Sequence, residues 1–322
     1  MNQYDYAYGV AYIRAIENKL LTAQDLEALI ASKSPLDAMR ILSDSGYNTD
    51  NVKPEDFEII LKEELEKTWA EAIYAMPKGA TLDFLLYKND FHNLKAALKG
   101  IRMGIKDYDK YILMPCTIDF NEILKSVEKA DFALLPDMLS QIAYKAYDIL
   151  GRTEDAQLSD TLIDKAAMDY CLDKAKETKN DFLIGYVTLQ NTLADIKIAA
   201  RCAHTLKSAD FMDDALSRES ALPRESLIRA SLEGFDSLMD FISESGFKSC
   251  AEALSSSMNE FEKLSDDMIS DYMKKSSGIS FGVEPIISYI NRRQTEIRNV
   301  RIIMSAKLNG FTEEQIRSRI RS

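Results

Sequence analysis

The sequence predicts an all-α fold, and three observations support this prediction. Glycine and proline are scarce, with 12 and 7 among 322 residues, whereas average proteins contain about 7% and 5% of them. These are the residues that most turns require. Apolar residues recur in steps of three and four over long stretches, as on the buried face of a helix. No run of alternating β-branched residues rivals these stripes, so we expect long helices joined by few turns.

The first helix start that the sequence marks clearly lies near residue 34. Ser34 precedes Pro35, and Asp37 follows. Serine caps free N–H groups, and the missing N–H of proline costs nothing in the first turn. Helix C-termini are predicted at three glycines, because glycine adopts the left-handed cap conformation most easily. These are Gly46, Gly246 and Gly310.

Two long helices are predicted in the middle and at the end of the chain. The apolar stripe of the first consists of Phe182, Tyr186, Leu189, Leu193, Ile196, Ala200 and Ala203. The stripe of the second consists of Ile286, Ile290, Ile297, Val300 and Met304. Pro285 suits the first turn of that second helix. Arg293 interrupts the second stripe, so the sequence places a charge on an otherwise apolar face.

Two short sequence patterns each occur three times. The first consists of Ile41–Tyr47, Met138–Tyr144 and Phe241–Phe247, at spacings of 97 and 103 residues. The second consists of Asn93–Lys95, Asp195–Lys197 and Glu296–Arg298, at spacings of 102 and 101 residues. The second pattern begins 52, 57 and 55 residues after the first. Recurrence in the same order predicts three related helical units, which are residues 1–105, 106–215 and 216–322.

Charge is distributed unevenly along the chain. The formal net charge is −12, which disfavours nucleic-acid binding because that function needs basic patches. From Arg292 onward, eight basic residues accompany three acids, a balance of +5, so the remaining chain carries −17. A basic last helix on an acidic body is either a docking surface or an internal charge match. Arg301 and Lys307 lie on this helix, and Arg301 is expected to extend toward solvent or to pair with an acid of another unit.

The cysteines and the N-terminus indicate a cytosolic protein. Cys116, Cys171, Cys202 and Cys250 are more than 30 residues apart, so no pair has the spacing of a zinc finger or a redox motif. The first eight residues lack the apolar core of a signal peptide. No stretch has the length and hydrophobicity of a membrane span.

The second repeated pattern carries the candidate polar site. In its first copy it reads Asp90-x-x-Asn93-Leu94-Lys95, and residues three apart share a helix face. One interpretation is a buried polar pair that joins this helix to a neighbour in every unit. The other is a ligand site that occurs three times. Variation among Asn, Asp and Glu at the equivalent position favours the structural interpretation.

Motifs of common enzyme classes are absent from the sequence. It contains no P-loop and no Gly-x-Ser-x-Gly nucleophile elbow. His92 and His204 are the two histidines. His204 and Cys202 are two residues apart, so a helix directs them to different sides and a zinc site is not expected. We therefore expect no cofactor and no metal.

One acidic stretch resembles a catalytic motif. Asp266, Asp267 and Asp271 are similar to the aspartate-rich sequence of helical prenyl-diphosphate enzymes, which hold Mg²⁺ through carboxylates on one helix face. The spacing is one residue too long for that motif, and no second acidic motif of the right form occurs. A solvated acidic face beside Lys274 and Lys275 is the preferred interpretation.

Several motifs resemble the C subunit of archaeal and bacterial V-type (A-type) rotary ATPases, a family related to the d subunit of the eukaryotic vacuolar ATPase. The C-terminal motifs are Glu284-Pro285-x-x-x-Tyr289, Glu296-Ile297-x-Asn299-Val300-Arg301 and Lys307-Leu308-Asn309-Gly310. The N-terminal motifs are Tyr4-x-Tyr6-x-Tyr8, Ile13-Arg14-Ala15 and Lys19-Leu20-Leu21. The middle contributes Asp90-x-x-Asn93-Leu94-Lys95 and Asp181-Phe182. Asp195 departs from the asparagine more common in the family, and Thr192 stands where an acid is common.

The resemblance implies three similar helical lobes arranged as a funnel around a pseudo-threefold axis. It implies a non-catalytic central-stalk protein, peripheral on the cytoplasmic face of the membrane. Its partners would be the central-shaft subunits of the ATPase head and the membrane rotor ring that carries H⁺ or Na⁺. No nucleic acid and no direct membrane span are expected.

Ten residues are the structural or interface candidates. They are Asp90, Asn93, Lys95, Asp195, Lys197, Glu284, Glu296, Arg298, Arg301 and Lys307. Two alternative functions remain, namely an all-helical prenyl-diphosphate enzyme that uses the three aspartates and a generic helical scaffold. The scaffold is disfavoured because solenoid repeats are much shorter than a hundred residues.

Overall fold

The computed structural model describes residues 3–153 and 156–321. Every regular element within these residues is helical and none is a strand, so the predicted all-α class is confirmed. The chain forms two compact units. Unit 1 comprises residues 3–81 and 258–321, and unit 2 comprises residues 82–153 and 156–257. Both ends of the chain therefore build one unit. The predicted boundaries at 105 and 215 concern internal repetition and stay a prediction.

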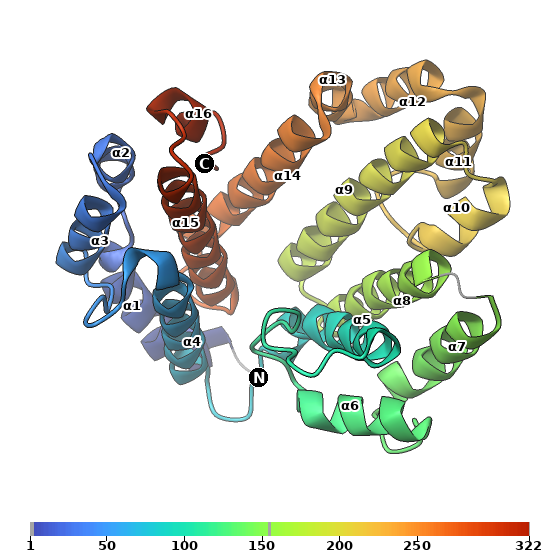
Figure 1. Ribbon diagram of the computed structural model, residues 1–322, viewed down its shortest axis with the longest axis horizontal. Helices are drawn as coiled ribbons and strands as arrows, with labels where there is room; N and C mark the ends of the chain where they lie inside the picture. The colour runs from blue at the N-terminus through green and yellow to red at the C-terminus, as the bar shows by residue number, and fades with distance from the viewer. Residues whose placement is uncertain (1–2, 154–155, 322) are drawn as a thin grey trace. The chain divides into compact units, whose positions relative to one another are not determined.

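Unit 1 is organised around α15 (Glu284–Leu308), which packs along α4 (Glu58–Ala75) (Figure 1). Its other helices are α1 (Ala7–Ile16), α2 (Ala23–Ala31), α3 (Pro35–Asp44), α14 (Met258–Met273) and α16 (Glu313–Arg317). Its short 3₁₀ turns are Gln3–Tyr6, Glu17–Lys19, Pro54–Asp56 and Lys274–Gly278. Ile297, Val300 and Ile303 of α15 are buried among apolar side chains of α2, α3 and α4. Helix α15, near the C-terminus, therefore shares one hydrophobic core with α2, α3 and α4, which lie in the first 75 residues.

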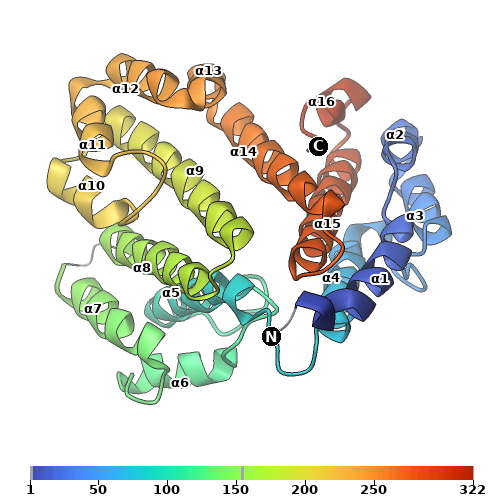
Figure 2. The same ribbon diagram turned by 180° about the vertical axis from the view of Figure 1, so that it is seen from behind.

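Unit 2 is organised around α8 (Ala156–Glu177), which packs against α5, α7 and α9 (Figure 2). These three helices are α5 (Tyr87–Met103), α7 (Asp137–Thr153) and α9 (Asp181–Thr205). The remaining helices are α6 (Phe120–Lys129), α10 (Ala209–Ala215), α11 (Arg224–Glu233), α12 (Phe235–Ile242) and α13 (Lys248–Ser256), and a 3₁₀ turn spans Asp83–Leu85. Phe91, Phe132 and Leu139 lie at the centre of the core shared by α5 to α8.

The predicted helix boundaries agree with the structure in most places. The Ser34 hydroxyl accepts a hydrogen bond from the Asp37 N–H at 3.1 Å, and Pro35 opens α3. Gly46 has a φ of 93° just beyond α3, and Gly310 has a φ of 70° just beyond α15. Gly246 also has a left-handed φ of 92°, but it lies in a five-residue π turn that links α12 to α13. The chain there kinks and continues as helix.

The two predicted apolar stripes lie on α9 and α15. All five predicted apolar positions of α15 are buried, and Arg293 is buried with them at 2% exposure. On α9, Tyr186, Leu193 and Ile196 are buried, whereas Phe182 is half-buried. Arg293 therefore does not reach solvent beside the apolar stripe of α15. It is a buried charge that needs buried partners.

Helices α1 and α4 approach closely at Gly9. A Cβ atom placed on Gly9 would lie 1.8 Å from the carbonyl oxygen of Ala75 at the end of α4. No side chain other than the hydrogen of glycine fits this distance. This close approach fixes α1 against α4, which lie side by side in both views (Figures 1 and 2).

Candidate functional site

Three long helices, α5, α9 and α15, each bury polar side chains at equivalent positions of the second repeated pattern. On α5, both Asp90 and Asn93 are completely buried. The Asp90 carboxylate accepts hydrogen bonds from the N–H groups of Thr117 and Ile118 at 2.8 and 3.1 Å, and from the Thr117 hydroxyl at 2.6 Å. Asn93 accepts from the Leu113 N–H at 2.8 Å and donates to the Leu113 carbonyl at 3.1 Å. Together these two residues hold the segment that precedes α6.

Helix α9 repeats this arrangement. Asp195, the equivalent of Asn93, accepts hydrogen bonds from the Ser217 N–H at 2.9 Å and from the Ser217 hydroxyl at 2.6 Å. Thr192, the equivalent of Asp90, accepts from the Ala221 N–H at 2.9 Å. The held residues again lie shortly before a helix, in this case α11. The two positions therefore keep the same function although the residue types differ, since each needs only an acceptor for a backbone N–H.

On α15 the equivalent residue, Glu296, binds a segment that comes earlier in the chain, whereas α5 and α9 bind segments that follow them. Glu296 accepts hydrogen bonds from the Leu21 N–H at 2.7 Å and from the Tyr47 hydroxyl at 2.6 Å. Leu21 precedes the N-cap residue of α2, Thr22. The last of the three long helices thus holds the segment between α1 and α2, 275 residues earlier in the chain.

A buried charge cluster surrounds Glu296. Arg293 forms ion pairs with Glu64 on α4, at 3.3 Å, and with Glu296. All three side chains are almost completely buried. Burial would lower the pKa of Arg293, but the Glu296 and Glu64 carboxylates outweigh it and raise that pKa above its ordinary value. Burial raises the pKa of Glu64, and Arg293 and Lys67 oppose this shift.

Burial also affects the carboxyl groups of α5 and α9. It raises the pKa of Asp90 and of Asp195 above their ordinary values, against the opposing effect of their hydrogen bonds. Each carboxylate is held by donors of its own unit. Both carboxylates therefore have a structural role. We call such a buried polar contact between a long helix and a connecting segment a structural tie.

The remaining candidates on the three long helices lie nearer the surface. Lys95 pairs with Asp164 on α8 at 2.5 Å, and Arg298 pairs with Asp266 on α14 at 2.5 Å. Lys197 and Glu284 are half-buried and also make polar interactions. The structure therefore does not gather the ten candidates into one site. It distributes them over three helices, each tied to its own surroundings.

Arg301 and Lys307 both bind groups of unit 1. Arg301 Nε and Nη2 donate to the two carboxylate oxygens of Glu58 at 2.8 and 3.0 Å. Lys307 Nζ donates to the carbonyls of Ile30 and Ser32 at 2.8 and 2.7 Å, at the C-terminal end of α2. Arg317 likewise pairs with Glu27 on α2 at 3.1 Å. Much of the basic C-terminal charge is therefore matched inside unit 1.

Tyr47 and Glu64 belong to the polar core of unit 1 but were not among the sequence candidates. Tyr47 closes the first copy of the first repeated pattern, which was a usable signal. Glu64 lies on the same face of α4 as the buried residues Ile60 and Leu61, which are four and three residues away. A carboxylate at a core position of a helix was a second signal, because buried charges need partners.

The acidic stretch of α14 has cationic partners. Asp266 pairs with Arg298 and with Arg321, at 2.5 and 3.0 Å, and Asp271 pairs with Lys274 at 2.5 Å. Residues 3–153 and 156–321 contain no group of three or more His, Cys, Asp or Glu side chains placed to hold a metal ion. Asp266 thus joins α14 to α15 and to the C-terminal residues, and Asp271 lies on an exposed face beside Lys274, which favours the structural interpretation of this stretch.

Comparisons with known proteins match nearly the whole length of the chain. Residues 10–319 match the family model described as ATP synthase (C/AC39) subunit. The C subunit of the V-type sodium ATPase of Enterococcus hirae is 22% identical over 319 residues, which cover 96% of each chain. The C subunit of the A-type ATP synthase of Methanobrevibacter smithii is 23% identical, over 97% of this chain and 87% of its own. That of Methanocaldococcus jannaschii is 24% identical, over 97% and 85%.

Proposed function

The chain belongs to the ATP synthase (C/AC39) subunit family, and we propose that it is the non-catalytic central-stalk subunit of a V/A-type rotary ATPase. In this function it joins the shaft of the ATP-hydrolysing head to the ion-carrying ring of the membrane. The observation that carries the proposal is the extent of the match. It spans residues 10–319 of 322, and the relatives named above are matched over most of their own lengths.

The proposal includes the three related units predicted from the sequence, residues 1–105, 106–215 and 216–322, arranged in cyclic order. Support comes from the three buried ties. Helix α5 holds the segment before α6, and α9 holds the segment before α11. Helix α15 holds the segment before α2, through Glu296 and the N–H of Leu21. Each long helix thus binds the start of the following unit, and the third unit is followed by the first. This order of contacts supports the proposal of a pseudo-threefold funnel.

Buried ties of this kind suit a part that transmits torque. Close-packed helices carry strain with little compression. Polar contacts such as those of Asp90 and Glu296 also fix the positions of the elements they join, because hydrogen bonds depend on direction and resist sliding of one element along another. A rotor component built in this way would deform little between its two partners.

We expect electrostatic attraction to guide the binding of the partners, and we call such an interface charge-led. Because much of the basic C-terminal charge is matched inside unit 1, the excess of acids remains for the surface. An acidic surface is complementary to basic groups on the shaft or the ring, and such charges mainly steer association. No helix within residues 3–153 and 156–321 has the length and hydrophobicity to cross a bilayer. We place the protein on the cytoplasmic face of the membrane as a peripheral component.

Co-purification from detergent extracts tests this assignment. A tag on this chain is expected to recover both the ATPase head and the membrane ring, and recovery should fall as salt rises from about 0.1 M to about 1 M. The Debye length shortens over this interval from about 10 Å to about 3 Å. The control is a tag on one of the head proteins, which should retain the head at both salt concentrations. Recovery of neither partner by the tagged chain would contradict the function, and salt-independent recovery would contradict a charge-led interface.

A further inference from the structure

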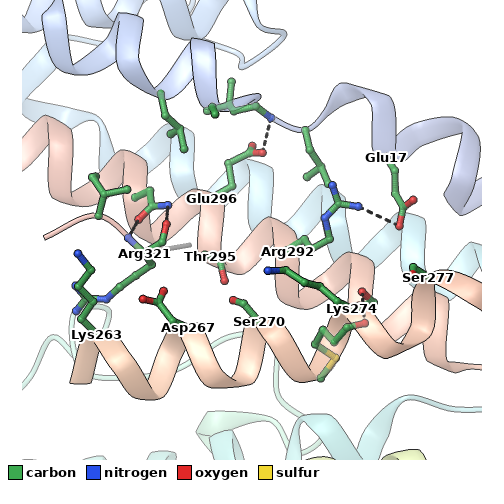
Figure 3. Close-up of a pocket in the computed structure, with 18 of the residues that line it drawn as sticks. Glu17, Lys263, Asp267, Ser270, Lys274, Ser277, Arg292, Thr295, Glu296 and Arg321 are labelled. Carbon is green, nitrogen blue, oxygen red and sulfur yellow. Dashed lines mark hydrogen bonds and ion pairs between the residues drawn. The ribbon is translucent and has the colours of Figure 1, made fainter. Parts of the chain in front are cut away.

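Unit 1 contains a cavity of about 870 Å³, and Leu21 and Glu296, which join the segment before α2 to α15, are among the residues that line it. It lies between α14, α15 and the segment that joins α1 to α2, and the C-terminal residues reach one end of it (Figure 3). The volume is within the usual range for a small-molecule site, about 300–1,000 Å³. All the residues that line it belong to unit 1.

The lining of the cavity is largely apolar. Beside polar and charged lining residues, aliphatic and thioether side chains from α2, α14 and the connecting segments contribute to this apolar surface. They are Leu20, Leu21, Leu26, Ile30, Met273 and Ile320. Such a wall favours a hydrocarbon ligand, because burial of apolar surface supplies most of the binding free energy.

The two ends of the cavity differ in charge. Figure 3 shows Lys274 and Arg292 near Glu17 at one end, and Lys263 and Arg321 near Asp267 at the other. Arg14 joins the first end, because it pairs with Glu17 at 3.0 Å and donates to the Ser276 carbonyl at 3.1 Å.

At this first end, three basic side chains in the lining share one lining carboxylate, that of Glu17. Arg292 lies 3.4 Å from that carboxylate, and Lys274 pairs with Asp271, which is outside the lining. The surplus of positive charge is therefore greatest at the end formed by Arg14, Lys274 and Arg292. A ligand with one anionic head would place the head there.

The distance between the two ends suits a single acyl chain. Lys263 and Lys274 both line the cavity and are eleven residues apart along α14 and its end, which corresponds to about 16 Å. An extended acyl chain can follow this length, and it needs much less width than a protein helix, which is about 11 Å across with its side chains.

We propose that this cavity binds one long-chain fatty acid, with its carboxylate between Arg14, Lys274 and Arg292 and its chain along Leu26, Ile30 and Met273. The half-buried Ser270 and Thr295 face the middle of the cavity (Figure 3). The site is formed by unit 1 alone, so the proposal does not depend on the proposed rotary function.

Calorimetric titration of the purified full chain with dodecanoate, below its micelle concentration, tests the site. Saturable one-to-one binding is expected, and hexanoate should bind on the order of 1,000-fold more weakly because it buries six fewer methylene groups. The double variant Lys274→Gln/Arg292→Gln should weaken dodecanoate binding at least about tenfold. Both side chains are exposed at the rim, so the fold should persist.

A matched control is Lys275→Gln. Lys275 lies 4.1 Å over the Tyr272 ring and does not line the cavity, so this variant should bind as the natural chain does. Ser270→Phe places a ring in the middle of the cavity and should abolish binding, with the helical circular dichroism signal as the check on folding. Absence of saturable binding would overturn the proposal. Equal binding of dodecanol, or dodecanoate binding unchanged in the double variant, would also overturn it.

Discussion

Replacement of Arg293 by methionine is expected to lower the free energy of unfolding by about 3–5 kcal/mol, because removal of one partner from a buried ion pair leaves the other charge uncompensated. In this protein the carboxylates of Glu64 and Glu296, with 5% and 6% exposure, would both lose Arg293, and Glu64 would keep its pair with Lys67 at 3.2 Å. Glu296 would also lose a partner while it still holds the Leu21 N–H and the Tyr47 hydroxyl. Urea denaturation followed by circular dichroism measures the change.

Two further variants separate the buried charge from its surroundings. Arg301→Met removes an exposed arginine from the same helix, where its bidentate pair with Glu58 is half-solvated. It should cost no more than about 1 kcal/mol. In the triple variant Arg293→Met/Glu64→Gln/Glu296→Gln the stranded charges are gone, so part of the lost stability should return. If Arg293→Met were as mild as Arg301→Met, the buried cluster would not stabilise unit 1.

Replacement of Gly9 by alanine should destabilise the chain by about 3 kcal/mol, because the new methyl group must displace the backbone of α4. The Cβ would lie 1.8 Å from the Ala75 carbonyl oxygen. Because that oxygen belongs to the backbone, rotation of a side chain cannot relieve the clash. The loss should appear although alanine is a better helix former than glycine. Thermal and urea melts provide the measurement.

Gly151→Ala is the matched control for this close approach. Gly151 lies in α7, and a Cβ placed there has no neighbour within 4 Å. The same substitution should therefore stabilise the chain slightly, by about 0.5–1 kcal/mol, through helix propensity alone. Equal effects of the two substitutions would show that α1 and α4 can separate at no cost.

The features predicted from the sequence are the local ones. The stripe of α15, the cap at Ser34 and the left-handed glycines at 46 and 310 depend on residues within a few positions of each other. Such signals survive in a single sequence because helix geometry fixes which residues share a face. Gly246 shows the limit, since its conformation was predicted but its π turn depends on how α12 and α13 pack.

The features that could not be predicted are partnerships across the chain. Glu296 binds the Leu21 N–H across 275 residues, and Arg293 binds Glu64 on another helix. Spacing within a helix cannot identify such a partner. The repeated pattern did locate Asn93, Asp195 and Glu296 as equivalent polar positions. It could not show that all three accept from a backbone N–H, because the N–H carries no sequence signal.

The uneven charge was a similar case. The sequence left open whether the basic C-terminus was a docking surface or an internal match. The pairs of Arg298, Arg301 and Arg317 with acids of unit 1 favour the internal match. The acidic excess elsewhere then becomes the stronger candidate for contact with basic partners.

ATP-driven ion transport in vesicles tests the central-stalk function most directly. Complexes reconstituted with the head and the ring, with and without this chain, would be compared for ATP hydrolysis and for ion uptake. The proposal predicts that omission of the chain abolishes uptake while the head still hydrolyses ATP, and that adding the chain back restores uptake. Undiminished ion transport in complexes that lack the chain would contradict it.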